Sequence, residues 1–285
     1  MVMDMKKIQS ILHVARNLLF CEWNDKRVII GFLAGMIVPS YWLKNFLDYV
    51  ASTGEPANIL EAFLVVEHEY KTVMFLALGW FLVVSDAPFI NENTCYSLYR
   101  TGKRSWNMAA VLYILIQAAL YTAAVALPMV LLSLPFGFVG KMWSNPVYML
   151  SQDYHMNWSA EYGVSFLQQN MMRRMDVPQA FAATALCFFL YLALMGVILY
   201  TGNLLLGGIW GIVIAFIVHI SGYELPFLGH ARLALMEYAC PGNFADSAGM
   251  HLLRPVMAMA GIAAGLVLIE GVFIDRVDFK GEAQE

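Results

Sequence analysis

Histidine and glutamate residues gather between positions 219 and 251, and side chains of these types bind metal ions or transfer protons. The residues are His219, Glu224, His230, Glu237 and His251. Zinc proteases use an HExxH sequence, which places two histidines on one face of a helix. The chain contains no HExxH, and the spacing of the five residues matches no ligand pattern. We therefore expect no metal-binding or catalytic residue, although a membrane-embedded enzyme that uses residues 219–251 stays an alternative.

Other residues that can do chemistry are explained more simply by packing. The four cysteines, Cys21, Cys95, Cys187 and Cys240, form no CxxC pair and are typical of an apolar interior. The 18 methionines are scattered at positions where leucine would fit, which indicates gap-filling and not copper binding. The sequence has no GxxxxGK[ST] phosphate loop, so we expect this chain to bind no nucleotide and no other cofactor.

The composition is typical of a membrane protein. Apolar residues make up 60% of the 285 residues and charged residues only 13%, whereas soluble domains carry roughly 25% charged residues. The mean hydropathy is +0.62, which indicates that most of the surface faces lipid. The formal net charge is −4, so the chain offers no broad basic face and we expect no nucleic acid partner.

Six apolar segments approach the roughly 20 residues that a membrane-spanning helix needs. They cover residues 28–49, 71–89, 108–139, 177–200, 204–221 and 252–273. Asp176 and Pro178 favour a helix start before the fourth segment. No internal repeat or soluble domain interrupts the pattern. We predict a single transmembrane domain over residues 1–285, an all-α integral membrane protein of about six transmembrane helices preceded by an amphipathic interfacial helix.

Charged residues lie at the ends of the predicted spans. Arg254 and Glu270 mark the two ends of the sixth span, and we expect Glu270 to face the interface. We find no Asp, Glu, Lys or Arg in the middle of a span. A proton- or ion-coupled carrier normally has such a residue. The pattern therefore favours transport that is powered from outside the chain.

Basic residues in short loops predict the orientation in the membrane. Ten of the 17 fall on one side if both termini are cytoplasmic: Lys6, Lys7, Arg16, Lys26, Arg27, Arg100, Lys103, Arg104, Arg276 and Lys280. We therefore place both termini in the cytoplasm. Residues 140–176 and 222–251 then form extracytoplasmic loops, and the second of these is expected to contain short broken helices. We expect His68, between two glutamates, in a solvated outer loop.

Residues 1–27 contain an amphipathic helix between Met5 and Trp23. Its apolar arc consists of Ile8, Ile11, Leu12, Ala15, Leu18, Leu19 and Trp23, with Val14 and Phe20 as exceptions. A basic amphipathic helix directly before a span is expected to lie along the inner membrane interface. It either anchors the first span or contacts a cytoplasmic partner, and both interpretations remain open.

The cytoplasmic loop at residues 86–107 is the most distinctive segment. Asp86 and Pro88 end the second span. Residues 94–100 are predicted to form a two-turn helix that stops at Thr101-Gly102, with glycine in the left-handed conformation. A basic inner loop alone would fix the topology, but it would not need a helix that carries Tyr96, Leu98 and Tyr99. These residues suit a docking surface.

Two stretches of this region resemble permease subunits of bacterial ATP-binding-cassette (ABC) exporters. They are Ser85-Asp-Ala-Pro-Phe and Tyr99-Arg-Thr-Gly-Lys-Arg-Ser-Trp106, and Asn58-Ile-Leu-Glu61-Ala-Phe adds to the likeness. The order of an amphipathic helix, six spans and a broken outer segment before the last span is also similar. The resemblance implies that the helix over residues 91–104 docks on a separate ATPase. The residues implied in docking are Asn91, Tyr96, Leu98, Tyr99, Arg100, Lys103 and Arg104.

The resemblance also implies a mechanism and a set of partners. ATP and magnesium would bind to the partner ATPase subunits, whose closure pushes on the docking helix and the N-terminal helix. One six-span chain cannot enclose a path, so a second permease, identical or related, is expected in the bilayer of a bacterial cytoplasmic membrane. The chain itself would not be an enzyme. Besides the enzyme using residues 219–251, the other alternative is a non-transporting sensor or assembly protein that uses loop 140–176.

Overall fold

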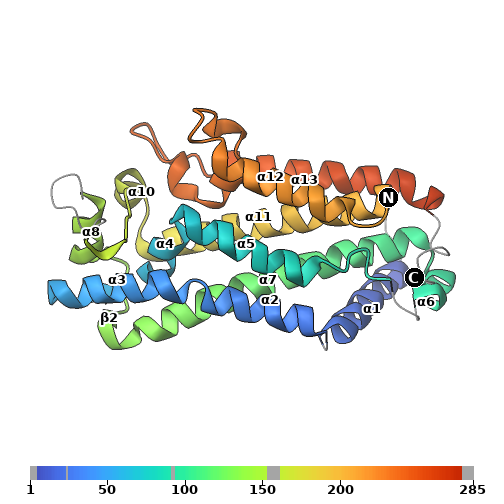
Figure 1. The fold of residues 1–285 in the computed structure, drawn as a ribbon, viewed down its shortest axis with the longest axis horizontal. Coiled ribbons are helices and arrows are strands. Elements are labelled where there is room, and N and C mark those ends of the chain that lie inside the picture. Colours follow the sequence, from blue (N-terminus) through green and yellow to red (C-terminus); the bar gives the residue numbers. More distant parts are fainter. Residues whose placement is uncertain (1–4, 24, 91–93, 153–160, 278–285) are drawn as a thin grey trace.

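The computed structural model describes residues 5–23, 25–90, 94–152 and 161–277. Over these residues the chain folds into one elongated bundle of helices (Figure 1). Four helices are long and apolar enough to cross a membrane: Lys26–Thr53, Lys103–Phe136, Val177–Leu206 and Leu253–Arg276. Two further apolar helices are shorter, α5 (Tyr70–Val84) and α12 (Trp210–Glu224). The prediction of an all-helical chain is thus confirmed, with four candidate membrane-spanning helices and two shorter apolar helices in the positions of the other two predicted spans.

The first long helix consists of two helices in line. α2 (Lys26–Ile37) begins at Asp25, whose carboxylate accepts a hydrogen bond from the Arg27 N–H. α3 (Ser40–Thr53) follows after Pro39, because proline cannot donate the backbone hydrogen bond that would continue the helix. Gly54, with φ 69°, ends α3 in the left-handed conformation. The predicted first span, residues 28–49, lies within this pair.

Two helices form the centre of the bundle. α7 (Lys103–Ser133) contains Pro128 and continues into η1 (Leu134–Phe136). α11 (Val177–Leu206) begins with a capping box between Asp176 and Gln179, so the predicted helix start is confirmed. α11 contacts α7, α5, α12 and α13 (Leu253–Phe273), which ends in η6 (Ile274–Arg276).

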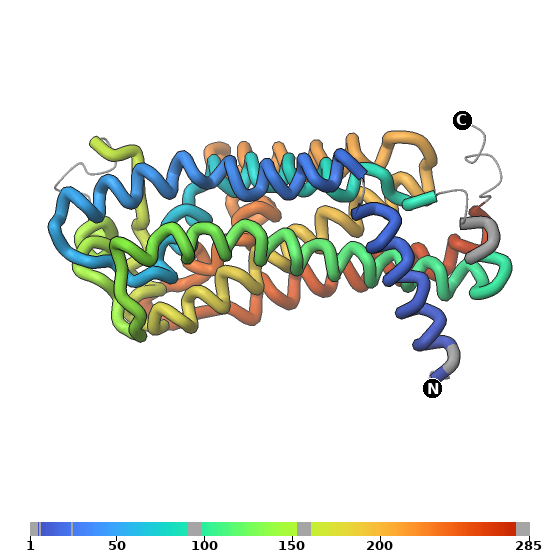
Figure 2. The backbone as a smooth tube through the Cα atoms, turned by 90° about the horizontal axis from the view of Figure 1, so that it is seen from below, coloured from blue at the N-terminus to red at the C-terminus, as the bar shows by residue number. Residues whose placement is uncertain are grey.

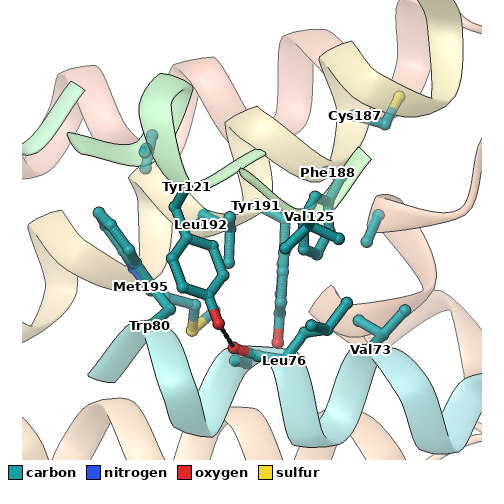
Figure 3. Packing of buried hydrophobic residues seen from close by; sticks show 14 of the residues in the cluster. Val73, Leu76, Trp80, Tyr121, Val125, Cys187, Phe188, Tyr191, Leu192 and Met195 are labelled. Atoms are coloured by element: carbon teal, nitrogen blue, oxygen red, sulfur yellow. Dashed lines mark hydrogen bonds between the residues drawn. The ribbon is translucent and has the colours of Figure 1, made fainter. Parts of the chain in front are cut away.

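Large aromatic side chains fill the space between α5, α7 and α11 (Figure 3). Trp80, Tyr121 and Tyr191 are fully buried there, and the Tyr121 hydroxyl donates a hydrogen bond to the Leu76 carbonyl at 2.8 Å. Gly79 makes this packing possible, because a Cβ at that position would lie 2.5 Å from the Tyr121 hydroxyl. The bundle interior is therefore specified by close packing in addition to its apolar character.

The N-terminal helix α1 (Met5–Glu22) crosses one end of the bundle obliquely (Figure 2). It packs against α7 and against α6 (Thr94–Thr101), and it buries Val14, Ala15 and Leu18. Leu12 and Trp23, on the adjacent flank, remain exposed. The helix is amphipathic as predicted, but Val14 belongs to its protein-facing side. The exposed apolar flank is of the kind that enters a membrane interface.

The opposite end of the bundle consists of short elements. They are β1 (Ala57–Asn58), parallel to β2 (Gly137–Phe138), α4 (Glu61–Glu67), α8 (Asn145–Ser151) and α10 (Gln169–Arg174). Buried Glu61 joins them, since its carboxylate accepts hydrogen bonds from the Asn58 N–H, the Ser144 N–H and the Ser144 hydroxyl. Burial raises the pKa of Glu61 to about 7 despite these donors.

Residues 225–252 connect α12 to α13 through three short turns of 3-10 helix. They are η3 (Ala231–Leu233), η4 (Leu235–Ala239) and η5 (Pro241–Phe244). The prediction of short broken helices in this segment is confirmed. In the description below, the end of the bundle with α1, α6 and η6 is the α6 end, and the end with α3, α4 and α8 is the α4 end (Figure 1).

Candidate functional site

The short helix α6 lies beyond the ends of the long helices, near α1 (Figure 1). It covers Thr94–Thr101, and Gly102, with φ 80°, separates it from α7. A residue with a Cβ is strained at such a φ value, so glycine allows the chain to turn sharply here. The predicted two-turn helix with its stop at Gly102 is confirmed.

The predicted docking residues divide into two groups. Tyr99 is 97% exposed and Arg100 is exposed next to it, whereas Leu98 packs against the core. Asn91 lies outside the described residues, and for Tyr96 only the backbone position within α6 is described. Of the predicted set, Tyr99 and Arg100 are therefore presented outward by α6.

Lys103 and Arg104 bind the last turn of the final span. The Lys103 ammonium donates hydrogen bonds to the carbonyls of Asp275 and Val277, at 3.2 and 2.5 Å. The Arg104 guanidinium pairs with the Asp275 carboxylate at 2.8 Å. These two basic residues hold α7 and α13 together, a role that the sequence pattern did not reveal.

Phe89 fastens the loop before α6 to the bundle. It is buried and has φ 59°, a conformation that non-glycine residues rarely adopt. Its ring contacts Tyr113 edge-on, with centroids 4.7 Å apart, and stacks on Tyr200 at 6.3 Å. Asn203 adds a second attachment, because its amide donates to the Ala87 carbonyl at 2.8 Å. A displacement of this loop must therefore move α7 and α11.

Arg27 links the same loop to the N-terminal helix. Its guanidinium pairs with Asp25, between α1 and α2, and with Asp86, directly after α5, at 2.5 and 2.8 Å. The carboxylate oxygens of Glu22, Asp25 and Asp86 lie within 4.8 Å of one another. Burial, followed by repulsion from Asp86 and Asp25, raises the pKa of Glu22 to about 7. Arg27 supplies the positive charge among these carboxylates, so we interpret the group as an ion-pair network and assign it no metal.

Glu22→Gln should stabilise the protein at alkaline pH. Because the folded-state pKa of about 7 lies above the usual 4.5, the stability from this group is full below pH 4.5 and is lost as pH rises through 7. Removing the charge should therefore raise the free energy of unfolding at pH 8 by about 1–2 kcal/mol after solvent screening. Thermal unfolding in detergent between pH 5 and 8 measures this, with exposed Glu224→Gln as the control. An unchanged pH profile in Glu22→Gln would contradict the assignment.

Glu270 is fully buried, and the expectation that it faces the interface is wrong. Its carboxyl oxygens contact the Thr201 hydroxyl at 2.5 Å and the Asn107 amide nitrogen at 3.2 Å. The Tyr200 hydroxyl donates to the Asn107 carbonyl oxygen at 2.6 Å. Three spans, α7, α11 and α13, thus meet in one polar cluster, Asn107–Tyr200–Thr201–Glu270. Ionisable residues inside a bundle are usually functional.

We infer that Glu270 is protonated. The Thr201 hydroxyl lies 2.7 Å from the Val197 carbonyl and 2.5 Å from a Glu270 oxygen, and its single proton can go to either acceptor. When it goes to the Val197 carbonyl, a protonated Glu270 donates to Thr201. A neutral carboxyl group satisfies all these contacts and avoids burying an unpaired charge.

The histidines and glutamates between residues 219 and 251 do not form one site. His219 is buried, and its ring nitrogens contact the Tyr191 hydroxyl at 2.6 Å and the Met74 carbonyl at 3.0 Å. Both nitrogens are thus satisfied by the bundle. Glu237 and His251 instead line a separate cavity in the segment between α12 and α13.

The side chain of His68 is buried next to Glu67 at the C-terminal end of α4, with its Nδ1 2.8 Å from the Leu64 carbonyl. The expectation of a solvated loop at this position is wrong. Burial lowers the pKa of His68 to about 4, so this histidine is neutral at ordinary pH.

Together, the fold and the site define an all-helical chain with four helices long and apolar enough to cross a membrane, in which one exposed short helix is fastened to the central helices. Comparison of the chain with known protein families, with curated proteins and with solved structures finds no match. Function must therefore be inferred from the geometry at the α6 end.

Proposed function

We propose that this chain is the permease subunit of an ATP-driven ABC exporter in a bacterial cytoplasmic membrane. The observation that carries the proposal is α6, a two-turn helix whose Tyr99 and Arg100 side chains point away from the bundle. A separate ATPase binds this helix and supplies the energy. The α6 end is cytoplasmic, and both termini lie on that side.

Six helices cross the membrane in this proposal. α5 and α12 have 15 residues each, about 22 Å at 1.5 Å per residue, which is less than the roughly 30 Å of the hydrocarbon core. Both pack on α11, and their ends continue into buried or apolar loop residues such as Phe89 and Phe227. The span that contains α5 is therefore completed by a non-helical segment that the bundle covers, an arrangement that membrane proteins tolerate. The residues after α12 are apolar and exposed, as at Phe227.

Two routes carry a push on α6 to the spans. Phe89 transmits it through its ring contacts to Tyr113 and Tyr200, and Tyr200 binds the Asn107–Glu270 pair. Arg27 carries it to the N-terminal helix through Asp86 and Asp25. Because spatial continuity alone does not establish coupling, Phe89→Ala is the substitution that tests the first route.

A second permease packs against α13 in this proposal. α13 is the least covered of the long helices, with 17% of its apolar window buried. Gly261 and Gly265 lie four residues apart on it, and no atom lies within 4 Å of the position that a Cβ would take at either. Small residues at this spacing let two membrane helices approach closely.

Arg100→Glu should lower the amount of ATPase that co-purifies with the protein by about fivefold. The reversed charge opposes contacts that the arginine makes with the partner, and rim charges of this kind are worth about 1 kcal/mol. The measurement is quantitative mass spectrometry after affinity purification. Arg173→Glu, the same reversal on exposed Arg173 at the α4 end, is the matched control and should have no effect. Equal ATPase recovery from wild type and Arg100→Glu would argue against docking at α6.

A further inference from the structure

A cavity of about 200 Å³ lies in the segment between α12 and α13, on the side of the protein away from α6. Its lining includes Arg232, Glu237, Tyr238, Asp246 and Arg254. Pockets for drug-sized ligands are larger, about 300–1,000 Å³. This cavity therefore fits a small polar group, such as one end of a larger molecule.

Among the described lining residues, one charged pair forms, between Asp246 and His251. Glu237 accepts a hydrogen bond from the neutral Asn243 amide. Asp246 accepts from the backbone N–H groups of Ala248 and Gly249 and lies 3.3 Å from His251.

Neither Arg232 nor Arg254 makes a side-chain hydrogen bond or ion pair with any residue that the structure describes. The lining thus offers two guanidinium groups for an anion and two carboxylates for a cation. Because guanidinium forks match phosphate oxygens, the anion that fits best is a phosphate.

In the six-span arrangement proposed above, the cavity lies toward the outer boundary of the membrane. α12 rises only about 22 Å from the α6 end, and the non-helical residues that follow it cover the rest of a hydrocarbon core of roughly 30 Å. Apolar residues next to the lining arginines are exposed: Leu253, next to Arg254, is 76% exposed. Leu233, next to Arg232, is equally uncovered. Such a surface is suited to acyl chains.

We propose that this cavity binds the phosphoethanolamine head group of a phospholipid in the outer leaflet. Arg232 and Arg254 bind the phosphate, Glu237 and Asp246 bind the primary ammonium group, and the acyl chains cover Leu233 and Leu253. The recognised chemistry is a phosphate and a primary ammonium on one small group. Lipid binding at this site does not need the ATPase, so it can be tested separately from the exporter function.

The test measures lipid binding to the purified full-length chain in detergent by native mass spectrometry. Dioleoyl phosphatidylethanolamine should bind about tenfold more tightly than dioleoyl phosphatidylcholine, whose methylated ammonium cannot donate hydrogen bonds, and than dioleoyl phosphatidylglycerol, which lacks the cation. Arg254→Gln and Glu237→Gln should each lower phosphatidylethanolamine binding by about tenfold. Arg173→Gln, on another exposed surface, should leave binding unchanged.

A folding control and a competition experiment distinguish the possible causes of a change in lipid binding. Unchanged thermal unfolding of the two variants in phosphatidylcholine shows that they fold, so that their binding loss is local. O-phosphoethanolamine, which is water-soluble, should compete weakly if the acyl chains contribute. Competition at the same concentration as the lipid would overturn the lipid assignment in favour of a soluble phosphoamine. Equal binding of the three lipids, or unchanged binding in both variants, would overturn the site.

Discussion

Glu270→Ala should lower the free energy of unfolding by about 2–3 kcal/mol, whereas Glu270→Gln should change it by less than about 1 kcal/mol. Alanine leaves the Asn107 amide without its acceptor and opens a cavity between α7, α11 and α13. Glutamine replaces a neutral carboxyl group almost atom for atom: its oxygen accepts from Asn107, and its amide donates to Thr201. Thermal or denaturant unfolding in detergent measures both variants.

Exposed Glu224→Ala serves as the control for this pair and should behave as wild type. The comparison between glutamine and alanine decides the protonation state. If glutamine is as damaging as alanine, Glu270 is held as a carboxylate and the hydrogen-bond assignment through Thr201 is incorrect. If neither variant is destabilised, the polar cluster does not hold the three spans together.

In the proposed permease, Phe89→Ala should lower the free energy of unfolding by about 3 kcal/mol and reduce stimulation of the partner's ATP hydrolysis at least tenfold, while ATPase binding is retained. The ring fills the space between Tyr113 and Tyr200, so its loss leaves a cavity at the attachment of the loop. Tyr99 and Arg100 stay available to the partner. Binding and coupling are therefore separated in this one variant.

The readouts for Phe89→Ala are ATPase recovery and stimulation of ATP hydrolysis by the permease in proteoliposomes. Phe227→Ala removes the same ring from an exposed position and is the matched control. Full coupling in a folded Phe89→Ala protein would exclude the aromatic contact as the route from α6 to the spans. Loss of ATPase binding together with coupling would instead mean that Phe89 shapes the docking surface itself.

Much of the architecture could be predicted because local rules control it. The capping pair Asp176 and Gln179 set the start of α11, and Gly102 separates α6 from α7. All six apolar segments are present as helices, with the first divided at Pro39. These features depend on residues that are neighbours in the sequence, so the sequence pattern contains them.

The parts that could not be predicted depend on contacts between distant segments. Glu270 lies one turn from the end of α13, where an interfacial position is the usual outcome. Its burial follows from Asn107 and Thr201, which come from two other helices. Similarly, the sequence pattern places Phe89 at the end of an apolar span. Only its packing with Tyr113 and Tyr200 shows that it attaches the loop before α6 to the bundle.

Polar residues inside apolar helices could have predicted this buried polar cluster from the sequence. Asn107, Thr201 and Asn203 all lie near the α6 end of their helices and are all buried. Buried polar groups need hydrogen-bond partners, so such residues on separate spans predict a common cluster. Lys103 and Arg104 bind the C-terminal turn at η6, whereas Arg100 is exposed. No sequence pattern predicted this division of the docking residues.

The measurement that tests the central claim most directly is affinity purification of the chain from its native membrane, followed by mass spectrometry of the proteins recovered with it. We expect a nucleotide-binding ATPase in stoichiometric amount, together with a second permease or a second copy of this chain, and about fivefold less ATPase with Arg100→Glu. Recovery of the folded chain alone, with no ATPase, would contradict the account.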